Sequence, residues 1–187
     1  MPDQINGKLS PFLREKRFRA AEPYLSAGRV LDVGCGIGLL TRYVTADRYL
    51  GIDLDRGSVE QARREHPTYR FLTLDEFAAH DPEEKFDTIV GLAVIEHVPD
   101  PKAWLEEMKR RLAPGGRMVL TTPHPSLEWA HALGARLGLF SRAASEEHNV
   151  LIDQKLMGRF AGSTGLRVEG FKRFLGGANQ LFILQEA

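Results

Sequence analysis

Residues 30–38 read VLDVGCGIG, an apolar stretch that runs straight into a glycine turn. The aliphatic residues before Gly34 predict a buried strand, Arg29–Val33. Glycine at every second position predicts a tight turn, because glycine adopts positive φ without steric cost and leaves the backbone open to a ligand. With a helix expected at Leu39–Ala46, the stretch predicts the opening strand, turn and helix of an α/β sheet.

The spacing of the glycines indicates which ligand the turn binds. In the dinucleotide fingerprint a third glycine stands three residues after the second, but here Leu39 occupies that position and Gly38 comes one residue earlier. Asp32 stands two residues before the first glycine. A pyrophosphate would be repelled by this carboxylate, whereas an ammonium group would be attracted to it, directly or through water. We therefore expect a ligand with an amino acid end.

Strands and helices alternate outward from this turn. The last two strands are joined through Gly176-Gly177, which predicts an antiparallel hairpin. The pattern predicts an α/β fold, a Rossmann-like αβα sandwich with a mostly parallel seven-stranded sheet and a C-terminal antiparallel hairpin. The further predicted strands are Tyr49–Ile52, Tyr69–Leu74, Phe86–Leu92, Arg117–Thr122, Arg167–Phe174 and Asn179–Gln185; the further helices are Pro11–Leu25, Arg56–Glu65, Pro101–Leu112, Trp129–Phe140 and Val150–Thr164.

The length of 187 residues fits one domain. We divide it into a leading helix (1–28), a cofactor-binding core (29–123), substrate-side helices (124–165) and a closing hairpin (166–187). Lys plus Arg and Asp plus Glu both number 25, so no electrostatic feature predicts nucleic acid or membrane as a partner. The single cysteine, Cys35, excludes an intramolecular disulfide and fits a cytoplasmic protein. The oligomeric state stays open.

The second predicted strand ends in an acid, Asp53, fifteen residues beyond Gly38. A carboxylate at the carboxyl edge of an α/β sheet can accept both hydroxyls of a ribose, and Leu54 stands beside it. The alternative is that Asp53 or Asp55 caps the helix that begins near Arg56.

Four segments in this order resemble the class I S-adenosylmethionine-dependent methyltransferases, in particular the type 11 domains: VLDVGCGIG, GIDLD, FDTIVGLAVIEHVPDP and LAPGGRMVLTTPHP. The resemblance implies S-adenosylmethionine as cofactor, S-adenosylhomocysteine as product and a small-molecule acceptor. It places the glycine turn at the methionine end, Asp53 at the ribose and Asp75 at the adenine amino group. The implied cofactor-binding residues are Asp32, Gly34, Cys35, Gly36, Gly38, Asp53, Leu54, Asp75, Glu76 and Phe77. The alternative for residues 74–77 is a helix cap.

Two further groups bear on the chemistry. Some relatives carry E-x-x-E-H after the fourth strand and bind a divalent metal, but Ala93 replaces the first acid before Glu96-His97, so we expect no metal site. In the family a histidine similar to His148 often faces the methyl group, so His148 is the candidate general base, with an exposed or capping histidine as the alternative.

Two other functions remain as alternatives to methyl transfer. A non-catalytic nucleotide-binding module could use the same fold. An NAD(P)-linked reductase is disfavoured by Leu39 and by the lack of a Tyr-x-x-x-Lys pair.

Overall fold

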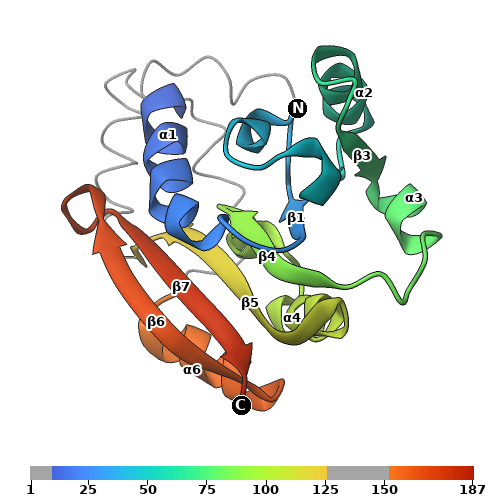
Figure 1. Cartoon of the computed structure of the whole chain (residues 1–187). Coiled ribbons are helices and arrows are strands. Elements are labelled where there is room, and N and C mark those ends of the chain that lie inside the picture. The colour runs from blue at the N-terminus through green and yellow to red at the C-terminus, as the bar shows by residue number, and fades with distance from the viewer. Residues whose placement is uncertain (1–9, 126–151) are drawn as a thin grey trace.

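A seven-stranded sheet runs through the molecule in the order β3-β2-β1-β4-β5-β7-β6 (Figure 1). The computed structural model describes residues 10–125 and 152–187. Strands β3, β2, β1, β4 and β5 are parallel, and β7 runs antiparallel to both β5 and β6. The predicted sheet and its closing hairpin are therefore confirmed. The strands are β1 Val30–Val33, β2 Tyr49–Asp53, β3 Arg70–Thr73, β4 Phe86–Leu92, β5 Leu112–Pro123, β6 Leu166–Phe174 and β7 Asn179–Glu186.

Helices cover both faces of the sheet, because neighbouring residues of each strand point to opposite sides. Val30 packs with α1 and α2 in one apolar cluster, whereas Leu31 packs with α3, α4 and α6 in the other. The three layers therefore follow directly from continuous apolar strands. The helices are α1 Ser10–Ala21, α2 Arg56–Glu65, α3 Leu74–Ala78, α4 Pro101–Arg110 and α6 Gln154–Ser163, and the 3₁₀ turns are η2 Glu22–Tyr24, η3 Leu39–Arg42, η4 Ala46–Arg48, η5 Ile95–His97 and η8 Leu175–Gly177.

The helix predicted at Leu39–Ala46 is wrong, since only the 3₁₀ turn η3 forms there. The turn starts from Gly38 in the left-handed conformation, and the Thr41 hydroxyl donates to the Gly38 carbonyl at 2.7 Å. Such local side-chain bonds compete with an α-helix, and the β-branched Thr41, Val44 and Thr45 lower its propensity further.

Other boundaries also differ from the prediction. The leading helix, expected at Pro11–Leu25, is α1 Ser10–Ala21, followed by the 3₁₀ turn η2. The turn at 113–116 lies inside β5, whose register against β4 shifts between Phe86 and Thr88. The helix predicted to start at Val150 starts at Gln154, where the Asp153 carboxylate caps it by accepting from Leu156 N–H at 2.7 Å. The predicted helix Trp129–Phe140 lies outside the described residues.

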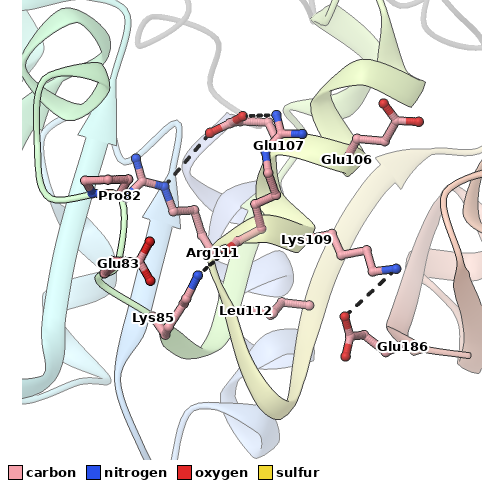
Figure 2. A pocket seen from close by; sticks show the side chains of 10 residues that line it. Pro82, Glu83, Lys85, Glu106, Glu107, Lys109, Arg111, Leu112 and Glu186 are labelled. Carbon is pink, nitrogen blue, oxygen red and sulfur yellow. Dashed lines mark hydrogen bonds and ion pairs between the residues drawn. The ribbon is translucent and has the colours of Figure 1, made fainter.

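An open depression lies at the amino-terminal ends of β4 and β5 (Figure 2). Its two lysine side chains already have partners within the depression. Lys109 pairs with Glu186 at 3.9 Å, and Lys85 donates to the backbone carbonyl of Arg110 at 2.7 Å. The glycine turn follows β1 and therefore lies at the opposite edge of the parallel sheet. Ligands of open α/β sheets bind at the carboxyl ends of the strands, so this depression is not the candidate site.

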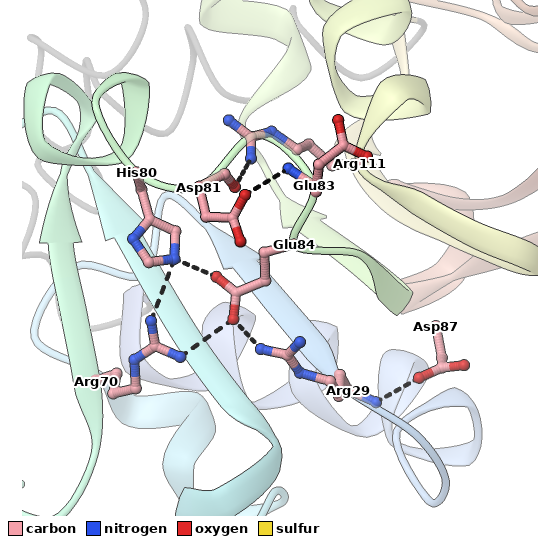
Figure 3. Close-up of polar contacts among 8 residues, drawn as sticks. All are labelled: Arg29, Arg70, His80, Asp81, Glu83, Glu84, Asp87 and Arg111. Atoms are coloured by element: carbon pink, nitrogen blue, oxygen red, sulfur yellow. Dashed lines mark hydrogen bonds and ion pairs between the residues drawn. The ribbon is translucent and has the colours of Figure 1, made fainter.

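A polar cluster around Glu84 ties three elements together at the same amino-terminal edge (Figure 3). The side chain of Glu84 is 9% exposed and contacts Arg29 before β1, Arg70 of β3 and His80 after α3. The Arg70 Nη1 to Glu84 Oε1 distance is 3.1 Å. One carboxylate therefore holds three basic side chains together at the start of the sheet.

Replacing Glu84 with Ala should destabilise the fold without affecting ligand binding at the other edge. Both arginines are about half exposed, so water compensates partly, and we expect a loss of about 1–2 kcal/mol, or roughly 2–8 °C in melting temperature. Thermal unfolding measures the loss, with Glu106→Gln on α4 as control. An unchanged melting temperature would show that the cluster contributes nothing to stability.

Candidate functional site

The glycine turn after β1 lies over the end of β2. The N–H groups of Gly34 and Cys35 both donate to the Ile52 carbonyl, at 2.8 and 3.0 Å. Gly34, Gly36 and Gly38 have φ values of +73°, +52° and +80°, so all three are left-handed. The turn therefore needs glycine for backbone reasons at each of these positions.

The three glycines differ in what surrounds them. A Cβ on Gly34 would lie 2.6 Å from Val94 Cγ2, and one on Gly38 would lie 2.6 Å from Phe71 Cζ. A Cβ on Gly36 would meet no atom within 4 Å. Gly34 and Gly38 therefore allow close packing, whereas Gly36 borders open space where a ligand could approach the backbone.

Asp53 connects the end of β2 to the glycine turn. Its Oδ2 accepts from Gly36 N–H at 2.7 Å, and its Oδ1 accepts from Asp55 N–H at 2.9 Å. The cap of α2 is Asp55, whose carboxylate accepts from Ser58 N–H at 3.1 Å. This decides the capping alternative in favour of Asp55. Each Asp53 oxygen retains acceptor capacity, and the neighbouring Leu54 is 81% exposed.

Asp32 is buried beneath the turn, with 4% of its surface exposed. Tyr49 donates its hydroxyl hydrogen to Asp32 Oδ2 at 2.7 Å. Burial raises the pKa of Asp32 to about 7; the Tyr49 hydrogen bond acts in the opposite direction, and the charge of Asp53 adds to the rise. Burial also raises the pKa of the Cys35 thiol, which fits the expectation that Cys35 is not a nucleophile.

Binding of a cationic ligand beside Asp32 should depend on pH. Because the folded pKa lies above the unfolded value of 3.8, ionisation of Asp32 costs stability, and stability falls as pH rises from about 3.8 to about 7. A nearby ammonium group favours the ionised form, so we expect affinity for S-adenosylhomocysteine to rise ~10-fold from pH 6 to 8, with proton release. Calorimetry in buffers of different ionisation enthalpy measures both effects, and affinity that falls over this range would contradict the assignment.

The segment after β3 forms the short helix α3 with a capping box. Thr73 Oγ1 accepts from Glu76 N–H at 3.3 Å, and Glu76 Oε2 accepts from Thr73 N–H at 2.7 Å. Glu76 also pairs with Arg63, and Phe77 is buried in the core. The structure thus has the helix-cap arrangement at residues 74–77, while Asp75 is exposed. The adenine contacts of Asp75, Glu76 and Phe77 stay predictions.

The segment after β4 packs against the glycine turn through Val94. Ala93 has a φ of +61°, which is strained for a residue with a side chain, and its N–H donates to the Thr121 carbonyl at 2.9 Å.

In residues 10–125 and 152–187, no three His, Cys, Asp or Glu side chains are grouped so that they could hold a metal ion. The candidate base His148 lies outside the described residues.

Arg14 is a candidate site residue that the sequence analysis missed. It lies on α1, partly buried, and forms no hydrogen bond or ion pair with any other described residue. Burial lowers the pKa of Arg14, and the like charge of Arg42, just after the glycine turn, lowers it further. The available signal was the basic residue Arg14 within the apolar pattern of the leading helix. The adjacent Glu15 accepts from the Tyr43 hydroxyl at 3.0 Å, so α1 lies beside the segment that follows the glycine turn, and Arg14 is there a candidate partner for an anionic group of a ligand.

None of the helices within the described part of the chain is both long and apolar enough to cross a membrane.

Comparison with known proteins gives one family match and several relatives. A family model described as "Methyltransferase domain" matches residues 5–169. The ubiquinone biosynthesis O-methyltransferase of Alkalilimnicola ehrlichii is 35% identical over 106 residues, which cover 52% of this chain and 42% of that protein. The enzyme of that name from Pasteurella multocida is 32% identical over 123 residues, covering 57% and 51%. The match thus spans about half the length of these curated relatives or less.

Solved structures share the fold at low sequence identity. The DhpI complex with S-adenosylhomocysteine is 16% identical with a TM-score of 0.72, and the match covers 98% of this chain and 90% of that one. The magnesium protoporphyrin IX methyltransferase of Synechocystis with bound S-adenosylhomocysteine is 17% identical with a TM-score of 0.64, covering 95% and 83%. These likenesses support the fold described above.

Proposed function

The chain belongs to the methyltransferase-domain family, and on that premise we propose that it transfers a methyl group from S-adenosylmethionine to a small-molecule acceptor. The observation that carries this proposal is the glycine turn joined to Asp53 by the Gly36 N–H bond. In this arrangement an open backbone and the carboxylate that we assign to the ribose lie side by side at the carboxyl edge of the sheet. Structural relatives with bound S-adenosylhomocysteine support the same cofactor.

Each part of the cofactor has a matching group in this chain. Asp53 accepts the ribose hydroxyls, and the exposed Leu54 beside it offers an apolar surface to the adenine. Asp32 attracts the ammonium group, and Arg14 attracts the carboxylate of the same amino acid end. Opposite charges at the two sides of the turn thus match a zwitterionic ligand.

The cofactor supplies an electrophilic methyl group, and the chain must orient the acceptor towards it and exclude water. Relatives named as O-methyltransferases favour a hydroxyl acceptor. For such an acceptor, the imidazole of His148 would take the hydroxyl proton. We further propose a cytoplasmic location, which the lone cysteine supports.

Incubation with methyl-labelled S-adenosylmethionine and a panel of phenols, carboxylic acids and amines tests this function. We expect labelled product from a hydroxyl acceptor, at a rate that EDTA does not change. Binding of S-adenosylhomocysteine without turnover on any acceptor would favour the alternative of a non-catalytic binding module.

A further inference from the structure

Glu96 is a buried acid whose carboxyl oxygens find no hydrogen-bond partner in the part of the chain that the structure describes. It lies in η5, directly after β4, and 1% of its surface is exposed. Neither carboxyl oxygen is hydrogen-bonded to any residue of the described ranges, and the Thr121 hydroxyl of the adjacent strand β5 is unpartnered there too. An orphaned buried carboxyl costs free energy, so a group that binds it is expected.

Two basic groups act on this acid, Arg17 of α1 and the neighbouring His97. Arg17 Nε donates to Asn179 Oδ1 of β7 at 3.1 Å, and the described residues provide no partner for its terminal nitrogens. Asn179 pairs with Pro123 of β5, and Ala93, just before η5, donates to the Thr121 carbonyl of the same strand. Arg17 and Glu96 therefore lie near the same end of β5. Burial lowers the pKa of Arg17, while the charge of Glu96 opposes that change. Arg17 and Glu96 nevertheless form no ion pair, although direct contact would remove both unsatisfied charges.

We propose that Arg17 and Glu96 form a subsite that holds a hydroxyl group of the methyl acceptor. A hydroxyl is the smallest group that accepts from a guanidinium and donates to a carboxyl at the same time. The segment that carries Glu96 also packs against the glycine turn through Val94, so the subsite adjoins the cofactor end of the sheet. This inference rests on the proposed function and extends it to phenols or alcohols as the substrate class.

Binding of catechol to the full chain loaded with S-adenosylhomocysteine tests the subsite, with 1,2-dimethoxybenzene as the probe whose hydroxyls are blocked. We expect catechol to bind at least ~10-fold more tightly than the blocked probe. The reason is that methylation removes the hydroxyl hydrogen, so the blocked probe cannot donate to the Glu96 carboxyl. Glu96→Gln and Arg17→Gln should each weaken catechol binding by a similar factor, whereas Glu106→Gln on α4 should not. Affinity for S-adenosylhomocysteine should stay within about 2-fold in all variants, since neither side chain is assigned to the cofactor.

Thermal unfolding distinguishes the subsite from a purely structural role of Glu96, which would make Glu96→Gln melt at a lower temperature. Because burial disfavours the charged form of Glu96 and raises its pKa, the neutral amide of Glu96→Gln should melt no lower than the unmodified protein. Equal binding of the two probes, failure of catechol to bind, or a lowered melting temperature with unchanged catechol affinity would overturn the subsite. If S-adenosylhomocysteine itself does not bind, the proposed function fails instead, so the two failures are distinguishable.

Discussion

Asp53→Ala should bind S-adenosylhomocysteine ~10-fold to 100-fold more weakly than the unmodified protein. On the proposed assignment, the substitution removes two charge-assisted hydrogen bonds to the ribose, each worth about 1.5–3 kcal/mol, and water replaces them partly. The substitution also removes the hydrogen bond that Gly36 N–H donates to Asp53 Oδ2 at 2.7 Å. Part of the loss of affinity therefore comes from a less ordered glycine turn. Calorimetric titration of the variant measures the affinity.

Asp55→Ala provides the matched control two residues away. Asp55 caps α2 and accepts from both Ser58 N–H and the Ser58 hydroxyl, so its loss should cost about 1 kcal/mol of stability while affinity is retained. The pair of variants separates ligand binding from helix capping. If Asp53→Ala keeps its affinity and only its melting temperature falls, the ribose assignment is wrong.

Gly36→Ala should mainly weaken ligand binding, whereas Gly38→Ala should mainly destabilise the fold. At Gly36 the new Cβ enters open space beside the turn, so we expect a loss of affinity of ~10-fold or more and a stability cost of about 1–2 kcal/mol from the left-handed backbone. At Gly38 the Cβ would lie 2.6 Å from Phe71 and 3.0 Å from His66 as well as in left-handed backbone. We therefore expect about 3 kcal/mol or more of destabilisation there.

Melting temperatures and cofactor affinities of both variants test this contrast. We expect Gly36→Ala to remain folded near room temperature and to bind the cofactor poorly. Should Gly36→Ala bind the cofactor as tightly as the unmodified protein, the open space beside Gly36 is not where the ligand approaches.

Most of the fold could be predicted from the sequence because its strands are continuous apolar runs separated by clear turns. The mostly parallel sheet and the closing hairpin followed from the alternation of elements and from Gly176-Gly177, whereas the strand order came from the structure. The segment after Gly38 was mispredicted because its apolar spacing suggested a helix, whereas a bond from the Thr41 hydroxyl to the Gly38 carbonyl closes a tighter turn. Local hydrogen bonds of this kind leave no periodic signal.

The candidate site was only partly predictable, for a different physical reason. The sequence placed an acid at the end of β2 but could not tell whether Asp53 or Asp55 caps α2, since both precede the helix closely. Arg14 and the pair of Arg17 and Glu96 depend on how α1 lies across the sheet, which brings residues far apart in the sequence together. Residue spacing alone cannot reveal such long-range pairing.

Titration of the full chain with S-adenosylhomocysteine, followed by competition with S-adenosylmethionine, is the most direct test of cofactor binding at the carboxyl ends of β1 and β2. We expect S-adenosylhomocysteine to bind saturably at one site per chain, S-adenosylmethionine to displace it, and Asp53→Ala to lose most of the affinity. Tight binding of NADH together with no detectable binding of S-adenosylhomocysteine would contradict it.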